Sequence, residues 1–481
     1  MKKSITKNYI YNLSYQFVII VAPLIVAPYV SRVFGANGVG IYSYTQSIVT
    51  YFKLIATLGI SLYAQIEIAY VQNDKVKRSK LFWEIIMIRL ATTVISLLFF
   101  TVYALNSGDY REIYLLQMID LAAVIFDITW FFQGMEDFKK IAYRNIVIKI
   151  IEILLIFTFV KTAKDLWIYV LCYGLTAFLA NISLWTFLRK YIVFVKLERL
   201  RFINHLKPIF FLFIPQIATQ IYTVLDKTLL GAITGSREEN GYYEQAQKIV
   251  RTALMIITAF GAVMLSRIAN EFSENRKDKI QDYIYNSFRF TLFLALPIMF
   301  GFISIADSFV PWFFGTGYEK VIIVLKILSP IVLCIGLSNV VGMQYLVPQK
   351  RQKEFTLSVT IGAVINVIIS LVLIPGLKSI GAAIASVAAE LMVIVIQIYY
   401  IRKEIGLKSI LSLGKNYLFG SLMMMGVMLL IEKLNHASFI TMLMQIVAGI
   451  VTYFVLLYLM KDDSMNYIMN ILKRRRGLGH D

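Results

Sequence analysis

The residues that could do chemistry in this chain are charged side chains inside otherwise apolar segments. Lys248 and Arg251 stand three residues apart after a short polar turn, so they share one face of a predicted helix. Lys53 lies near the middle of an earlier apolar segment. Ammonium and guanidinium groups can replace the lost hydration of a bulky anionic group such as a diphosphate. The cations that we predict for such a site are Lys53, Lys248, Arg251, Arg32, Lys227, Arg89 and Lys149.

Each of these cations also has a structural interpretation. Arg32 and Lys227 lie near the ends of apolar segments, where a long side chain can reach the membrane surface. The others could be neutralised by carboxylates, and Lys149 and Glu152, three residues apart, are predicted to pair. A carboxylate at bilayer depth could instead carry a proton or a sodium ion. The candidates for ion coupling or charge pairing are Asp226, Asp120, Asp127, Glu152 and Glu390.

An internal repeat relates two of the charged regions. An offset of 201 residues aligns identical residues at Gly40 and Gly241, and the same offset aligns four further pairs: Tyr42 with Tyr243, Gln46 with Gln247, Ile48 with Ile249, and Val49 with Val250. Duplicated polar hairpins in membrane transporters commonly face a shared cavity. The repeat therefore predicts that Lys53, Lys248 and Arg251 line one stripe across two related halves.

The composition places these residues in a polytopic membrane protein. Hydrophobic residues make up 58% of the chain and charged residues 16%, with a mean hydropathy of +0.70. Because one spanning helix needs about 20 apolar residues, we predict an all-α protein. It has fourteen spans, near 10–34, 40–62, 81–105, 113–133, 143–160, 166–188, 208–232, 246–266, 288–306, 320–346, 355–374, 381–401, 413–432 and 438–460.

The basic residues indicate how these spans are oriented. With the N-terminus inside, 33 of the 48 lysines and arginines fall in the inner connections and the inner termini, which is the bias of cytoplasmic loops. Both termini are therefore predicted to be cytoplasmic. The net charge of +19 marks membrane orientation rather than nucleic-acid binding.

The connection between the sixth and seventh spans divides the chain. It is basic and amphipathic, as expected of a segment on the inner leaflet. The predicted domains are a six-helix bundle over 1–190, a cytoplasmic linker over 191–207, a second six-helix bundle over 208–402, and two extra helices with a basic tail over 403–481.

Several absences argue against an enzyme. The sequence has no GxxxxGK[ST] phosphate loop and no GxSxG nucleophile elbow. Its three histidines lie outside the predicted spans, and both cysteines sit in apolar runs, so no metal site is indicated. We expect neither a catalytic residue nor a bound cofactor.

Several stretches resemble one family. They are APYVSRVFGANGVGIYSYTQSIVTYF at 27–52, LGISLYA at 58–64, FFQGMEDFKKIAYRNI at 131–146, LDKTLLG at 225–231 and NGYYEQAQKI at 240–249. Together they resemble the Wzx-type oligosaccharide flippases of the multidrug/oligosaccharidyl-lipid/polysaccharide exporter superfamily.

The resemblance implies two six-helix bundles forming a V around a central cavity, here with two extra helices. It implies a secondary transporter that turns undecaprenyl-diphosphate-linked oligosaccharides from the inner to the outer leaflet of a bacterial cytoplasmic membrane by alternating access. Capsule or another surface polysaccharide would be the product, and polysaccharide polymerase machinery and membrane lipids would be the partners. From the carboxylates named above we also expect coupling to a proton or sodium gradient. The matching diphosphate positions are Lys53, Lys248 and Arg251, with Arg32, Asp226 and Lys227 at the motif ends; Tyr42, Gln46, Tyr243 and Gln247 fit glycan contact or packing.

Three alternatives remain at this stage. A multidrug cation exporter of the same fold should have an acidic, aromatic cavity. A lipid II flippase should have more arginines in its first span than Arg32 alone. A membrane polymerase or ligase should show a large outward loop with catalytic arginines or histidine, which this sequence lacks.

Overall fold

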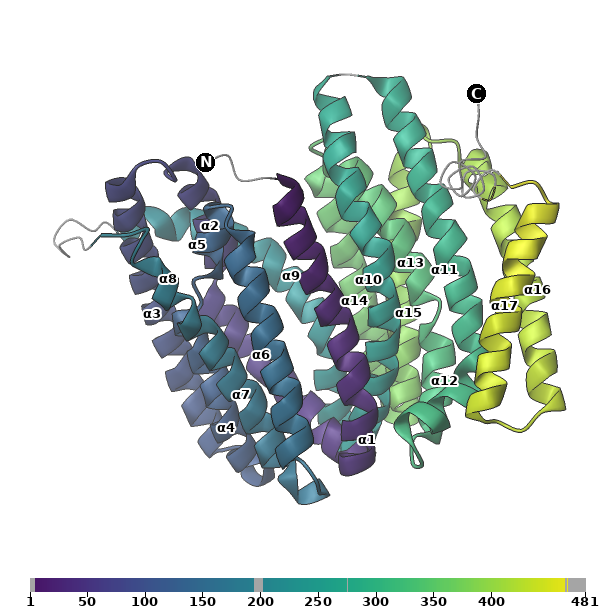
Figure 1. The fold of residues 1–481 in the computed structure, drawn as a ribbon, viewed down its shortest axis with the longest axis horizontal. Coiled ribbons are helices and arrows are strands. Elements are labelled where there is room, and N and C mark those ends of the chain that lie inside the picture. The colour runs from purple at the N-terminus through teal and green to yellow at the C-terminus, as the bar shows by residue number, and fades with distance from the viewer. Residues whose placement is uncertain (1–4, 194–201, 275, 463–464, 466–481) are drawn as a thin grey trace. The chain divides into compact units, whose positions relative to one another are not determined.

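The structure is a computed structural model that describes residues 5–193, 202–274, 276–462 and 465. Every regular element in these ranges is a helix, as Figure 1 shows. The prediction of an all-α membrane protein is confirmed. The predicted linker, 191–207, lies partly outside the described residues, which resume at Phe202 just before α9 (Ile203–Thr234).

Ten helical stretches of the described chain are long and apolar enough to cross a membrane. The first of them, Val21–Tyr70, contains most of the first two predicted spans. The predicted span 143–160 lies on α6 (Phe138–Phe159), which is not among these ten stretches. It is more polar than they are because it carries Arg144, Lys149 and Glu152. The predicted spans 208–232 and 246–266 lie on α9 and α10, which include side chains outside the described part, and they stay predictions.

The chain divides into two compact units, Met1–Gly241 and Tyr242–Asp481. The first unit thus contains α9, which the sequence assigned to the start of the second bundle; the four domain boundaries themselves stay a prediction. The helices of the first unit are α1 (Ile5–Thr57), α2 (Ile60–Tyr70), α3 (Lys75–Leu105), η1 (Gly108–Tyr110), α4 (Arg111–Ala122), η2 (Ala123–Phe126), α5 (Thr129–Gly134), α6, η3 (Ala163–Asp165), α7 (Leu166–Ser183), α8 (Trp185–Leu188), α9 and the start of α10 (Arg237–Ser273).

The second unit begins within α10 and ends with the two extra helices. Its elements are α11 (Lys277–Phe314), α12 (Glu319–Leu328), α13 (Ile331–Ser338), the π-helix η5 (Asn339–Leu346), α14 (Gln352–Leu377), α15 (Ser379–Ile401), α16 (Leu407–Leu434) and α17 (Phe439–Leu459). The extra helices α16 and α17 pack on α11, where the hydroxyl of Tyr453 donates to the carbonyl of Phe293 at 2.8 Å.

Two breaks shape the beginning of the first unit. Gly35 has non-helical angles (φ 62°, ψ −179°) inside α1, which separates the two predicted spans there. Between α1 and α2, Leu58 and Gly59 both have positive φ, and α9 crosses at this point. A Cβ atom on Gly59 would lie 2.9 Å from the backbone nitrogen of Phe213, so only glycine allows the crossing.

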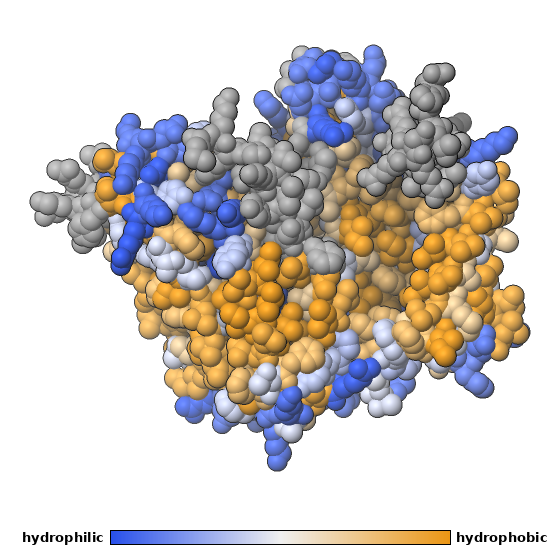
Figure 2. Space-filling view, viewed as in Figure 1, coloured by the Kyte–Doolittle hydropathy of each residue, from blue (hydrophilic) through white to orange (hydrophobic). Residues whose placement is uncertain are grey.

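The surface matches a bilayer. On the face shown in Figure 2, apolar residues gather along the middle of the helices and hydrophilic residues at their ends. Large apolar side chains are exposed in both units, for example Phe99 on α3 and Val372 on α14. Such a broad apolar surface is what lipid-facing helices present.

Candidate functional site

Six of the predicted charged residues come together as three ion pairs within the first unit. The pairs are Lys53 Nζ with Asp120 Oδ2 at 2.5 Å, Arg89 Nη1 with Asp127 Oδ2 at 3.1 Å, and Lys149 Nζ with Glu152 Oε1 at 2.7 Å. The formal charges of these six residues cancel. Three of the cations predicted for a diphosphate site, Lys53, Arg89 and Lys149, therefore lie in neutral pairs, which is the structural interpretation left open above.

The Lys53–Asp120 pair joins the second half of α1 to α4. The side chains are 28% and 13% exposed, so the ammonium group keeps access to its surroundings. Gln46, two turns before Lys53 on α1, donates its Nε2–H to Oδ2 of Asp120 at 3.2 Å. One carboxylate oxygen is therefore shared by an ammonium and an amide group.

A second glutamine extends this network. Gln117, one turn before Asp120 on α4, is 1% exposed. Its Nε2 donates to Oγ1 of Thr45 at 3.0 Å and to Oε1 of Gln46 at 3.3 Å. Its own Oε1 is buried and has no hydrogen-bond partner among the described residues.

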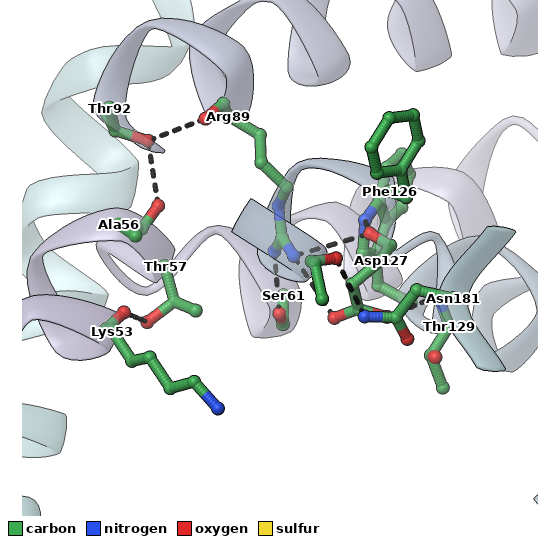
Figure 3. Close-up of polar contacts among 12 residues, drawn as sticks. Lys53, Ala56, Thr57, Ser61, Arg89, Thr92, Phe126, Asp127, Thr129 and Asn181 are labelled. Carbon is green, nitrogen blue, oxygen red and sulfur yellow. Dashed lines mark hydrogen bonds and ion pairs between the residues drawn. The ribbon is translucent and has the colours of Figure 1, made fainter. Parts of the chain in front are cut away.

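The Arg89–Asp127 pair is built differently, and Figure 3 shows it. The Arg89 side chain is 0% exposed. Its Nη1 also donates to the carbonyl of Asp127 at 3.3 Å, and its Nη2 donates to Oγ of Ser61 at 2.8 Å. In the same view the side chain of Lys53 extends away from this cluster. Arg89 links α2, α3 and the segment after α4 in one buried contact.

This contact lies at a break in a predicted span. The sequence predicted one helix over 113–133, but α4 ends at Ala122, the short η2 follows, and Asp127 is extended. Side chains of other helices take the released carbonyls: Asn181 Nδ2 donates to Ala123 and Trp185 Nε1 to Phe126, both at 2.8 Å. Non-helical backbone at membrane depth persists where protein groups satisfy it in this way.

The Lys149–Glu152 pair confirms the predicted pairing on α6. Oγ1 of Thr176 on α7 donates to the other carboxylate oxygen of Glu152 at 3.5 Å. The Lys149 ammonium lies 5.5 Å from the ring centre of Tyr173. The ring of Tyr42 meets that of Tyr169 edge to face, with centroids 5.0 Å apart, and lies 5.6 Å from the ring of Tyr173.

The repeated residues of the second unit have other partners. Tyr243 is buried, and its hydroxyl lies 2.8 Å from Oγ of Ser386 on α15. Gln247 donates its Nε2–H to this hydroxyl at 3.3 Å. The aligned Gln46 instead bonds Asp120. Gln46 and Gln247 therefore have different hydrogen-bond partners although they are equivalent in the repeat, and the predicted glycan contacts stay a prediction.

The remaining predicted charged residues lie on four helices, α1, α9, α10 and α15. Lys248 Nζ lies 4.0 Å from Oε1 of Glu244 one turn earlier on α10, and Arg251 is exposed. Arg32 is exposed on α1, and Lys227 is half-buried on α9. The two predicted carboxylates outside the pairs, Asp226 and Glu390, are buried at 4% and 9% exposure.

Equivalent glycines of the repeat contact each other's helix. A Cβ on Gly40 would lie 1.5 Å from the carbonyl oxygen of Arg237, and a Cβ on Gly241 would lie 2.0 Å from that of Ala36. Ala36 and Arg237 are themselves related by the 201-residue offset. The contact is reciprocal, as at a two-fold axis. It supports the repeat, whereas a stripe shared by Lys53, Lys248 and Arg251, and the V-shaped cavity, stay predictions.

Sequence reasoning missed the residues that support the pairs. Gln117, Thr45 and Ser61 carry no formal charge and were not singled out. Gln117 could have been predicted from the sequence, because it stands three residues before Asp120 and so shares its helical face. Ser61 could not have been predicted, since its hydrogen bond with Arg89 depends on how α2 and α3 pack.

Known proteins of two kinds resemble this chain in sequence. The profile of a family described as "Polysaccharide biosynthesis protein" matches residues 5–272. A protein of Escherichia coli strain K12 named as an O-antigen transporter is 26% identical over 411 residues, covering 84% of this chain and 98% of its own. A glycan biosynthesis flippase of Haloferax volcanii is 23% identical over 201 residues, covering 40% of this chain and 41% of its own.

Solved structures share the fold. A lipid II flippase in an inward closed conformation superposes with a TM-score of 0.75 at 18% identity, covering 95% of this chain and all of that chain. An inward-facing multidrug transporter of the MATE family gives 0.62 at 14% identity, covering 85% and 96%. These likenesses establish the helical architecture and leave the cargo open.

Proposed function

The chain belongs to the polysaccharide biosynthesis protein family, and from this premise we propose that it flips undecaprenyl-diphosphate-linked oligosaccharide repeat units from the inner to the outer leaflet. The observation that carries the proposal is the match to O-antigen transporters of Escherichia coli and Shigella dysenteriae, each covered over 98% of its length. A membrane flippase fold accompanies that match.

The first unit offers a chemical reason for a diphosphate cargo. Lys53 is a cation at membrane depth whose side chain is 28% exposed. An ammonium group in such a place can exchange its carboxylate for a phosphate oxygen. Lys248 and Arg251, on one face of α10, are the further cations that we assign to the diphosphate.

The remaining parts of the proposal follow from the same transport reaction. The protein would work by alternating access in a bacterial cytoplasmic membrane, with both termini in the cytoplasm. It would make or break no covalent bond of the cargo, and transport would be coupled to a proton or sodium gradient. The product would supply capsule or another surface polysaccharide, in company with the polymerase machinery.

A multidrug cation exporter of the same fold is the main alternative. The ion pairs weaken the argument from charge against this alternative. Three cations of the first unit are neutralised by carboxylates, so the site is less cationic, and less different from the acidic cavity of a drug exporter, than the sequence suggested. A lipid II flippase is the other alternative, and its structural likeness concerns the fold alone.

A flipping assay in proteoliposomes tests the proposal. Purified full-length protein is reconstituted with a fluorescent polyprenyl-diphosphate-linked oligosaccharide, with and without a proton or sodium gradient. We expect the labelled lipid to change leaflets far faster than in empty vesicles. The matching polyprenyl monophosphate glycan, lipid II and a cationic dye serve as comparison cargoes; transport of the dye without transport of the diphosphate lipid would contradict the proposal.

A further inference from the structure

We propose that the Lys53–Asp120 pair is an exchange site, at which the diphosphate takes Lys53 and Asp120 takes one proton. Loading of cargo would then be coupled to proton uptake at a defined carboxylate. This inference rests on the proposed function, since it requires a diphosphate ester as cargo.

The geometry permits Lys53 to leave its partner. Asp120 is the only carboxylate within 4.0 Å of its ammonium group in the described chain, and the side chain is partly exposed. A lysine ammonium is a single point charge on a flexible four-carbon stem, so it can turn to a new anion without dismantling a fork of hydrogen bonds. Arg89, buried and bonded through both terminal nitrogens, lacks this freedom.

The proton follows from charge balance. A sugar diphosphate ester carries two negative charges, and binding it moves the Lys53 ammonium from the carboxylate to a phosphate oxygen. An unpaired carboxylate at bilayer depth is costly, and binding one proton from adjoining water removes its charge. On release the ammonium returns to Asp120 and the proton leaves. No covalent bond other than the carboxyl O–H forms or breaks.

The two glutamines can serve both protonation states. An amide side chain exchanges its donor and acceptor when it turns over. Gln46 now donates to the ionised Asp120; turned over, its Oε1 would accept the proton of a neutral carboxyl. If the Gln117 amide turns over as well, its Oε1, a buried acceptor that has no partner among the described residues, would accept from Nε2 of Gln46.

The other charged groups near Asp120 are bonded to partners of their own, so Asp120 is the group that would change its protonation state. On α1 the facing charge is Lys53. On α3 the buried cation Arg89 is bonded to Asp127. The helix α7 packs against Asp120 at Gly174 and carries no charged residue. On α6, Lys149 and Glu152 pair with each other.

Proton counting tests the exchange. A short-chain polyprenyl diphosphate ester of N-acetylglucosamine is titrated into the purified full chain in nanodiscs, by calorimetry in two buffers of different ionisation enthalpy. This diester has no titrating proton near neutral pH, so the count reports the protein. We expect about one proton taken up per ligand bound, from linkage of binding to the carboxyl. In Asp120→Asn the ligand should still bind, with proton uptake near zero.

Two further variants keep the result specific. Glu152→Gln should retain the proton count, and its loss there instead of in Asp120→Asn would overturn the assignment. Gln117→Leu removes the waiting acceptor, so the midpoint of proton uptake in a pH series should move to lower pH. An unmoved midpoint would count against the amide relay.

The outcomes separate this inference from the function it rests on. If the wild-type chain neither binds nor flips the ester, the proposed function fails. If it binds and flips the ester with no proton uptake, with a count unchanged in Asp120→Asn, or with sodium replacing the proton, the exchange at Asp120 fails while the function stands.

Discussion

The Lys53–Asp120 and Arg89–Asp127 pairs use the same chemistry in two different ways. In both, a cation of a neighbouring helix meets a carboxylate from the segment that begins with α4. Lys53 is partly exposed and has one ionic partner, whereas Arg89 is fully buried and bonds a carboxylate, a carbonyl and a hydroxyl. The contrast indicates that the burial of a charged side chain and its number of bonds decide whether it could change its partner.

The helix break explains why neighbouring carboxylates differ. Asp120 and Asp127 are seven residues apart, which on a continuous helix would place them on one face. Because η2 and the extended Asp127 intervene, Asp127 turns toward Arg89 and caps the backbone N–H of Thr129 at 3.0 Å. Asp120 remains on regular helix, next to α1.

The largest effect is expected from Arg89→Met. It leaves Asp127 without its cation in a buried site and should cost about 3–5 kcal/mol of stability. The measurement is the midpoint of thermal unfolding in detergent, together with the yield of monodisperse protein. The double variant Arg89→Met with Asp127→Asn should recover part of the loss. If Arg89→Met were as stable as the wild type, the structural role of this pair would be refuted.

Removing the predicted diphosphate cations should come next. Alanine at Lys53, Lys248 or Arg251 removes charge-assisted contacts worth about 1.5–3 kcal/mol each, so transport should fall roughly tenfold or more per site. Surface-polysaccharide export and flipping in vesicles are the measurements, and membrane insertion should persist. Normal export by the triple variant would defeat the assignment.

A charge swap separates the effect of the Lys53–Asp120 pair on stability from its effect on transport. Lys53→Asp combined with Asp120→Lys keeps an ion pair, so stability should stay within about 1 kcal/mol of the wild type. Transport should nevertheless fall at least about tenfold, because the cation has moved to α4 and the phosphate contact with it. Each single reversal places like charges together and serves as the unstable control. Full transport by the swapped pair would show that its position does not matter.

The smallest change in stability is expected from Asp120→Asn. The partly exposed Lys53 loses its partner but keeps access to its surroundings, so the cost should lie well below the roughly 3–5 kcal/mol expected for Arg89→Met. The transport reaction should instead lose its response to a proton gradient, measured in vesicles with and without a pH difference. A drop in stability as large as that of Arg89→Met would erase the distinction between the two pairs.

Sequence alone predicted the helices and the contacts that lie within one helix. The Lys149–Glu152 pair follows from its spacing on α6, and the helical class follows from hydropathy. The partner of Lys53 did not follow, because it lies on another helix and depends on tertiary packing. The break before Asp127 had no signal either, since Ala123–Phe126 contains neither proline nor glycine.

The repeat shows the same limit. The offset identified Gly40 and Gly241 as equivalent, and the structure added that each makes room for the other's helix. The offset did not show that Gln46 and Gln247 would acquire different partners. The two identical glycines keep the close approach of the helix backbones, whereas the partners of the two glutamines depend on the side chains around them.

The reciprocal glycine contact also bears on the origin of the chain. A half-length ancestor that assembled with a second copy of itself would have placed this one glycine on its symmetry axis, where both subunits meet through the same residue. Fusion of two gene copies would then have kept the crossing while freeing each half to diverge. The presence of Lys53 in one repeat and of Lys248 and Arg251 in the other would be such a divergence.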